Sequence, residues 1–341
     1  MKRIKTIDAV GHVLCHDLTR IVRGVTKGAK FTKGHIVTED DIPMLLSMGK
    51  ETLYVWEACD GKMHENDAAE ILYSLCADEN MSPTDVKEGK IEVIADCDGV
   101  LTVDTHKLKA INSIGEIIIS TRFSGFYVKK GEKLAGMRAI PLVIDNAKIE
   151  KAKHIGGNKP LLSITPLKDK KIAILTIGNE VYSKRIEDSF TSVIDEKLVG
   201  YNASAIQKTI LPDQSELITE KILEAINNGA DFIICAGGMS VDADDRTPFA
   251  IKSTGAEIIS YGAPVLPGAM LMLGYYNKGI PIIGLPACVM YGKRTIFDIL
   301  LPKLLADIRI TAGELTEMGH GGFCLNCESC VFPICGFGRG A

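Results

Sequence analysis

The feature that most constrains the fold is a regular alternation of short apolar runs and amphipathic segments between residues 168 and 312. The apolar runs are short and rich in branched side chains, which favours buried strands. The predicted strands cover 171–177, 203–210, 232–236 and 281–285, and the predicted helices cover 186–198, 214–227, 247–253 and 289–306. Alternating strands and helices form mostly parallel sheets with helices on both faces. The segment therefore predicts a doubly wound α/β domain.

The rest of the chain is organised differently. Its first part is β-rich with one short helix, and the part that follows mixes both element types. In that second part we predict helices over 67–77 and 104–114 and strands over 91–95, 116–123 and 139–144. The run Gly156–Pro160 has linker composition and marks a boundary. We therefore predict a β-rich segment at 1–57, an α+β domain at 58–165, the α/β domain at 166–312 and a Cys-rich tail at 313–341.

Composition excludes several classes of protein. The net charge of −4 gives no bulk attraction for nucleic acid, so we expect no nucleic-acid partner. No run reaches 18 uninterrupted apolar residues, so we expect no membrane-spanning segment. The basic N-terminus is not followed by an apolar run of signal-peptide length. The sequence therefore predicts a soluble cytoplasmic protein.

The stretch from Asp231 to Thr247 carries the clearest chemical signal. Gly237 and Gly238 follow a predicted strand and allow a sharp turn that brings the backbone close to a ligand. A strand, a Gly-Gly turn and a helix N-terminus form an anion cradle, because free N–H groups point into it. Carboxylates follow at Asp242, Asp244 and Asp245. The pattern indicates a phosphate-bearing ligand that is handled together with a metal ion.

Other loops leave the carboxyl ends of predicted strands, where open α/β sheets bind their ligands. They cover 176–182, 262–268 and 284–288, and each combines Gly or Pro with small or polar residues. Hard oxygen ligands for magnesium are available from Glu180 and Asp188 as well as from the acidic cluster. The hydroxyls of Ser240 and Thr247 are expected to donate to ligand oxygens.

Five motifs carry a resemblance to the molybdenum insertase family. They are T-I-G-N-E-V at 176–181, I-L-P-D-Q at 210–214, G-G-M-S-V-D-A-D-D at 237–245, L-P-G-A-M at 266–270 and G-L-P-A-C-V at 284–289. Their order and spacing agree with that family's motifs T-G-[DN]-E-[LV], I-V-x-D-[DN], G-G-[VT]-S-x-G-x-x-D, K-P-G-K-P and G-[LF]-P-G-N-P. The segment Lys27–Val55 also resembles a stretch that directly precedes the binding domain in insertases.

The resemblance implies a molybdopterin-binding domain, with molybdate as the second substrate and Mg²⁺ as the metal. Carried over by position, it implies that Asp242 or Asp245 binds magnesium and acts in catalysis. The residues implied to contact molybdopterin are Thr176, Gly178, Asn179, Glu180, Gly237, Gly238, Ser240, Pro267, Gly268 and Pro286. Domains of this family commonly associate as dimers or trimers, so the resemblance also implies a homo-oligomer.

The sequence departs from the family pattern at three places, and these departures change the function that the resemblance implies. Asp242 stands where the pattern has glycine, Ala269 replaces a lysine, and Ala287-Cys288-Val289 replaces Gly-Asn-Pro. Losing the lysine removes a point charge suited to an oxyanion. The resemblance therefore favours molybdopterin binding over molybdate insertion, and it leaves open a non-catalytic carrier or chaperone that serves a molybdoenzyme.

A rival within the same fold remains open. The run D-D-R-T-P at 244–248 resembles the D-D-x-T of competence-damage-type pyrophosphatases and the R-D-x-T-P of adenylylating molybdopterin proteins. Those proteins form or attack a phosphoanhydride with a metal ion. The ligand is then adenylylated molybdopterin or a nucleotide.

The tail contains four closely spaced cysteines, Cys324, Cys327, Cys330 and Cys335. Three cysteines at intervals of three with a fourth nearby can surround one soft metal centre. The run approaches the ferredoxin-type spacing, so an iron–sulfur cluster, a zinc ion and a metal-free redox tail all remain open. Such a tail suggests sulfur or metal exchange with a molybdoenzyme.

Overall fold

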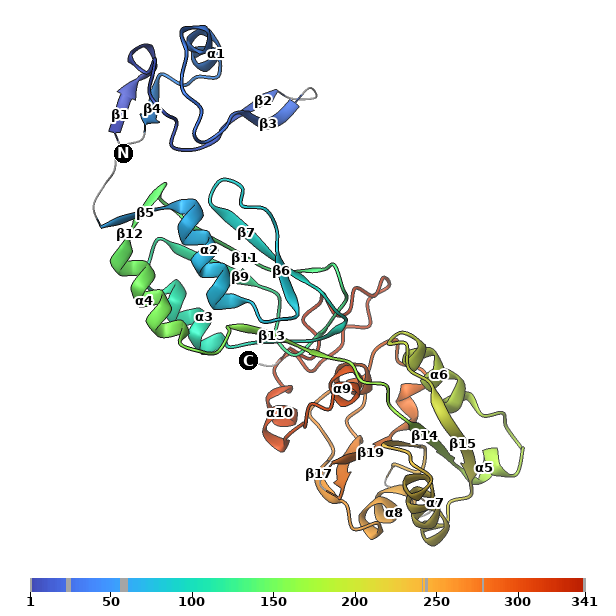
Figure 1. The fold of residues 1–341 in the computed structure, drawn as a ribbon. Coiled ribbons are helices and arrows are strands. Elements are labelled where there is room, and N and C mark those ends of the chain that lie inside the picture. The colour runs from blue at the N-terminus through green and yellow to red at the C-terminus, as the bar shows by residue number, and fades with distance from the viewer. Residues whose placement is uncertain are drawn as a thin grey trace. The chain divides into compact units, whose positions relative to one another are not determined.

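The computed structural model describes residues 2–22, 26–55, 61–240, 242, 245–277 and 279–339. These residues form two compact units (Figure 1). The first unit comprises Met1–Asp96, Asp104–Arg122 and Glu132–Leu162, and the second comprises Cys97–Val103, Phe123–Gly131 and Ser163–Ala341. The chain therefore enters the second unit twice before residue 163.

The first unit is built around a four-stranded antiparallel sheet with the order β6-β7-β11-β9. Its strands are β6 (Met81–Pro83), β7 (Lys90–Ala95), β9 (Ile117–Thr121) and β11 (Lys133–Ala139), and its helices are α2 (Glu65–Cys76), α3 (Thr105–Asn112) and α4 (Asn146–Gly156). Side chains alternate along β7, so that Ile91 and Val93 are buried. Helix α2 packs on β7 and β11 and buries Leu72.

The N-terminal part of this unit contains two further strand pairs. Strand β1 (Lys2–Lys5) pairs with β4 (Thr52–Val55), and β2 (Leu18–Val22) pairs with β3 (Thr26–Phe31). Helix α1 (Ile42–Ser47) and the strands enclose a small core around Leu14, Leu45 and Leu53. A third pair joins β5 (Lys62–His64) and β12 (Val143–Asp145).

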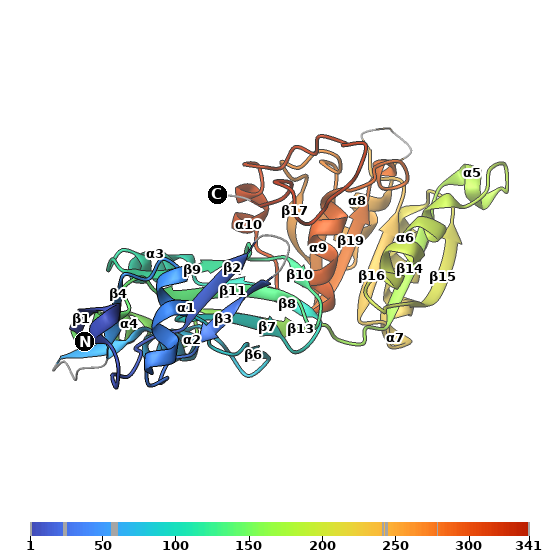
Figure 2. The same ribbon diagram turned by 90° about the horizontal axis from the view of Figure 1, so that it is seen from above.

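The second unit contains a six-stranded sheet with the order β15-β14-β16-β19-β18-β17, in which the first four strands are parallel (Figure 2). The strands are β14 (Ile172–Ile177), β15 (Ala205–Leu211), β16 (Phe232–Ala236), β17 (Glu257–Tyr261), β18 (Met272–Tyr276) and β19 (Ile280–Leu285). The predicted doubly wound, mostly parallel fold is confirmed. The antiparallel edge pair β17 and β18 was not predicted.

Helices cover both faces of this sheet. Their bounds are α5 (Asn179–Tyr182), α6 (Ser189–Val199), α7 (Ser215–Asn227), α8 (Thr247–Ser253), α9 (Ile296–Leu305) and α10 (Ala312–Glu317). Side chains of α6, α9 and α10 join one core, and side chains of α7 and α8 join the other. Helix α6 leads from β14 to β15 on one face of the sheet, and α7 leads from β15 to β16 on the other face. Because β15 and β16 lie on opposite sides of β14, the strand order reverses beside β14. This is the switch point at which such sheets bind ligands.

A small sheet with the order β10-β8-β13 completes the second unit. It consists of β8 (Gly99–Val103), β10 (Tyr127–Val128) and β13 (Leu162–Pro166). The Tyr127 ring packs edge-on against Tyr201, with ring centroids 4.9 Å apart. These residues from the middle of the chain thus help to form the C-terminal unit.

Helix starts differ from the sequence prediction for a local reason. Helix α6 begins at Ser189 rather than at residue 186, because the Asp188 carboxylate caps it by accepting from the Thr191 N–H at 3.0 Å. Helix α9 begins at Ile296 rather than at 289, because Thr295 and Asp298 form a capping box. The predicted strand at 139–144 is wrong, since β11 ends at 139 and β12 starts at 143.

Helix α4 and strands β8 and β11 were not predicted. Within the described ranges, no helix combines the length and the hydropathy that crossing a bilayer requires.

Candidate functional site

Three loops that leave the carboxyl ends of β14, β16 and β19 line one open cleft of about 1760 Å³ in the second unit. A fourth wall comes from Leu266–Met270. The cleft collects nearly all the predicted ligand contacts, namely Gly178, Asn179, Glu180, Gly237, Gly238, Ser240, Asp242, Asp245, Pro267, Gly268 and Pro286. Segments that are far apart in sequence therefore meet where the strand order reverses.

The Gly237–Gly238 turn requires glycine at both positions. Both residues have positive φ, +96° at Gly237 and +58° at Gly238. A Cβ on Gly237 would lie 2.2 Å from the Ile177 carbonyl oxygen, and one on Gly238 would lie 2.7 Å from Thr247 Oγ1. Glycine therefore allows the loops after β14 and β16 to come into backbone contact at the floor of the cleft.

Asp213 also lines the cleft, although it was not among the predicted site residues. Its carboxylate accepts from the Asn179 N–H at 2.9 Å, and its own N–H donates to Asn179 Oδ1 at 3.2 Å. The reciprocal pair fixes the loop after β14 to the end of β15. The signal that could have identified Asp213 is its place in the I-L-P-D-Q motif, directly after a strand.

Two threonines do not serve as predicted. The Thr247 hydroxyl donates to the Gly237 carbonyl at 2.8 Å, and the Thr247 N–H donates to the Gly238 carbonyl at 3.2 Å. Thr247 therefore closes the turn and does not present its hydroxyl to a ligand. Thr176 is buried inside β14 and shares a hydrogen bond with Thr191 at 3.1 Å. The structure does not bring Thr176 to the cleft.

The charge on the cleft wall has one sign. Carboxylates come from Glu180, Glu187, Asp213, Asp242 and Asp245, and the described lining residues include no Lys, Arg or His. Asp244 lies outside the described residues. A cleft with this lining repels an anion unless a cation accompanies it.

Asp242 and Asp245 are the candidates for a magnesium site on the cleft wall. Asp242 is exposed and Asp245 is half-buried, and the Asp245 N–H donates to the Asp242 carbonyl at 3.0 Å, which holds the two residues in one turn. Magnesium usually takes one or two carboxylates together with substrate phosphates. Of the other predicted ligands, Glu180 lines the cleft, whereas Asp188 is the cap of α6.

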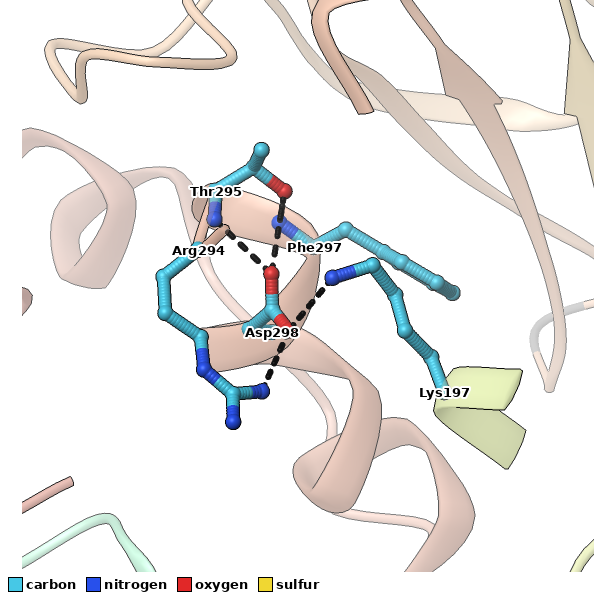
Figure 3. A network of polar contacts seen from close by, with 5 residues as sticks. All are labelled: Lys197, Arg294, Thr295, Phe297 and Asp298. Carbon is cyan, nitrogen blue, oxygen red and sulfur yellow. Dashed lines mark hydrogen bonds and ion pairs between the residues drawn. The ribbon is translucent and has the colours of Figure 1, made fainter. Parts of the chain in front are cut away.

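A buried charge network lies at the start of α9, which follows the cleft wall formed by 286–291 (Figure 3). The Asp298 carboxylate is 2 % exposed and accepts from Lys197 Nζ at 2.7 Å and from the Arg294 guanidinium at 2.9 Å. It also accepts from the Thr295 N–H at 2.8 Å. Lys197 belongs to α6 and Asp298 to α9, so the network ties together the two helices next to this wall.

Cys288 lies on this wall and is half-buried, and burial raises the pKa of its thiol. The tail cysteines line a separate pocket of about 310 Å³. There the Phe332 N–H and then the Arg294 guanidinium lower the pKa of the Cys330 thiol. No three Cys, His, Asp or Glu side chains in the described part of the chain converge on a point that could hold a metal ion. The structure therefore gives no support to the iron–sulfur or zinc centre that the spacing of Cys324, Cys327, Cys330 and Cys335 left open beside a metal-free tail, and the role of these cysteines stays a prediction.

Two family models match the chain. Residues 173–306 match the family described as "Probable molybdopterin binding domain", and residues 3–57 match one described as a domain of unknown function. The chain therefore carries a molybdopterin-binding-type domain over 173–306. The matched range includes β16, β19 and all of β14 except Ile172, together with every loop that lines the cleft.

The curated relatives match this chain over only part of their own length. A CinA-like protein of Thermosipho melanesiensis is 40% identical over 130 residues, which cover 37% of this chain and 32% of the relative. The molybdenum cofactor synthesis protein cinnamon of Drosophila melanogaster is 27% identical over 164 residues, which cover 46% of this chain and 26% of the relative. The chain thus spans about a third or less of these relatives.

Among solved structures, the molybdopterin biosynthesis enzyme MoaB of Thermus thermophilus is similar, with 22% identity and a TM-score of 0.35. The match covers 42% of this chain and 97% of that protein. Specific similarity to the insertases, as opposed to other proteins that carry this domain, is not established by these matches.

Proposed function

We propose that the cleft binds molybdopterin, free or adenylylated, together with Mg²⁺, as part of molybdenum cofactor biosynthesis or maturation. The observation that carries the proposal is the convergence of the three strand-end loops on one cleft whose charged lining residues, among those described, are all carboxylates. Asp242 and Asp245 would hold the ion. A bound Mg²⁺ would supply the positive charge that a phosphate needs and that the cleft wall lacks.

The chain's own residues would then position the ligand. Gly237 and Gly238 let the loops after β14 and β16 pack closely at the floor of the cleft, and the exposed Ser240 hydroxyl is free to donate to a ligand oxygen. Ala269 lies on the wall at the position where the resembled family has a lysine. Because no basic side chain replaces it there, binding and delivery of molybdopterin to a molybdoenzyme are better supported than molybdate insertion.

A binding titration tests this proposal. Fluorescence of molybdopterin and of adenylylated molybdopterin is followed with the full-length protein, with and without Mg²⁺. We expect Mg²⁺-dependent binding that weakens by at least about tenfold in the double variant Asp242→Asn, Asp245→Asn. Glu196→Gln, an exposed acid of α6 outside the cleft lining, is the matched control and should bind normally. Equal binding by the double variant and the wild type would contradict the proposal.

The acidic lining also supports a second candidate, hydrolysis of a phosphoanhydride, because clustered carboxylates with metal ions promote such displacements. The test is to add ADP-ribose with Mg²⁺ and to follow the release of AMP, alongside adenylylated molybdopterin with molybdate and Mg²⁺. Cleavage of ADP-ribose supports the hydrolase, and formation of molybdenum cofactor supports insertion. Tight molybdopterin binding without either product supports a carrier.

A further inference from the structure

The Cys-rich tail is held in place by aromatic packing and by hydrogen bonds to its backbone. The Phe332 ring lies between Phe126 and Phe337, with centroid distances of 6.0 and 6.1 Å, and the Arg294 guanidinium stacks on it at 5.2 Å. Lys293 Nζ donates to the carbonyl oxygens of Cys327 and Glu328 at 3.1 and 3.0 Å. Structural zinc sites, by contrast, supply the folding free energy of the segments that they hold.

The thiols nevertheless surround one space. All four cysteines line the same pocket of about 310 Å³, with Phe323, Leu325, Val331, Phe332 and Phe337 forming much of its wall. Cys327 and Cys330 are exposed, and Cys324 and Cys335 are half-buried. Residues 324–335 form a loop throughout. The thiols therefore stand around a pocket, on a backbone that is not locked into helix or strand.

Backbone hydrogen bonds connect the lining of the pocket with that of the cleft. The Leu266 N–H donates to the Gly322 carbonyl at 2.7 Å, and the Cys324 N–H donates to the Leu266 carbonyl at 2.8 Å. Leu266 itself lines the cleft. The loop before α9 contributes residues to both the cleft and the pocket, because Tyr291 lines the cleft and Arg294 lines the pocket.

We propose that Cys324, Cys327, Cys330 and Cys335 form an acceptor site for one soft, thiophilic metal ion that is taken up and released. Thiolates select soft ions, and each thiol that binds gives its proton to solvent. To ligate the ion, the loop would have to bring the thiols closer together, because no three of them converge in the described structure. If the neighbouring cleft binds molybdopterin as proposed, the site would hold metal cargo beside it. The metal binding itself does not depend on that function.

The test is an anaerobic titration of the reduced, metal-free full-length protein with Cd²⁺, followed by the thiolate-to-metal charge-transfer absorption. We expect about one Cd²⁺ per chain and at least a tenfold loss of affinity (roughly 1.4 kcal/mol) in the double variant Cys327→Ser, Cys330→Ser. Cys97→Ser, which lies outside the pocket lining, is the matched control and should bind like the wild type. Molybdopterin binding is measured on the same samples, so failure of either site is seen separately.

Hydrogen exchange of the metal-free protein supplies the second readout. The amides of Cys324 and Gly338 donate to Leu266 and Gly321 at 2.8 and 2.9 Å and should stay protected without metal. Loss of that protection on metal removal would show a structural centre and overturn the proposal. Absence of Cd²⁺ binding, unchanged binding by the double variant, or stoichiometric iron and sulfide in the anaerobically purified protein would each overturn it too.

Discussion

At the scale of single residues, two separate constraints exclude a Cβ atom at position 237, where the chain has glycine. Its φ of +96° is costly for any residue with a Cβ, and that Cβ would also lie 2.2 Å from the Ile177 carbonyl oxygen. The second constraint involves backbone, which cannot move aside like a side chain. The position therefore determines how closely the loops after β14 and β16 approach each other.

We expect Gly237→Ala to lower the free energy of unfolding by about 3–5 kcal/mol, because backbone strain and a backbone clash add. The measurement is urea unfolding of the full-length protein. We also expect molybdopterin binding to weaken, since the clash displaces the floor of the cleft.

Gly229→Ala separates the effect of backbone strain from the effect of the backbone clash. Gly229 has the same φ of +96°, but a Cβ there would meet nothing within 4 Å. Its replacement should cost only the backbone strain, about 1–2 kcal/mol. If both variants lose the same stability, the close approach to Ile177 is not a constraint on the fold.

The residue scale also shows the limit of sequence interpretation. The glycine turns and carboxylates could be identified because their chemistry is local and their spacing is distinctive. The roles of Thr247 and Asp213 could not, because each is determined by a partner that only the fold brings near: the Gly237 carbonyl for one and Asn179 for the other. The binding roles of the cleft residues remain predictions.

At the scale of secondary-structure elements, the contact between α6 and α9 depends on the Asp298 carboxylate. Removing it leaves the Lys197 ammonium, whose side chain is only 11 % exposed, without its counter-charge, and it also removes the partner of Arg294, whose side chain is 37 % exposed. We expect Asp298→Ala to cost about 3–5 kcal/mol, because a buried charge that loses its partner is strongly destabilising. Thermal or urea unfolding measures this.

The pair Lys208 and Asp195 provides the comparison, since it joins the same residue types at 2.5 Å with side chains 47 % and 32 % exposed. Exposed pairs contribute about 0–1 kcal/mol, so Asp195→Ala should be nearly neutral. Similar losses in both Ala variants would show that burial of the Asp298 network is not what makes it important.

The sequence was most informative for strands and helices that repeat one pattern. Strand β16 and helix α8 were predicted with the observed ends, because apolar runs bounded by Gly or capping residues leave little choice. The edge strand β17 and its neighbour β18 were missed, since their pairing is antiparallel and lies outside the βα alternation. Strands such as β8 are defined by partners far away in sequence, which a local pattern does not contain.

At the scale of the whole molecule, the units are not consecutive stretches of chain. Residues 97–103 and 123–131 belong to the C-terminal unit, while 104–122 between them belong to the first. Each predicted domain was one continuous range of residues, so the prediction did not include this interleaving of the two units. Its consequence is that neighbouring positions in sequence support different units.

Phe126 and Ile119 test this interleaving. Phe126 is buried and its ring packs on Phe332 of the tail, so Phe126→Ala should cost about 3–5 kcal/mol. Its local effect should be faster hydrogen exchange at the amides of Cys324 and Gly338, within the tail. Exchange along strand β11 of the first unit should stay near the wild-type rate, because Phe126 belongs to the second unit.

Ile119→Ala should have the opposite pattern, although it lies only seven positions away. Ile119 is buried in β9 and is paired with Met137 of β11, so its truncation should cost about 2–5 kcal/mol and speed exchange in β9 and β11. The tail amides should remain protected. If both variants deprotect the same amides, the two units unfold as one cooperative body, and the division of the chain between them has no energetic meaning.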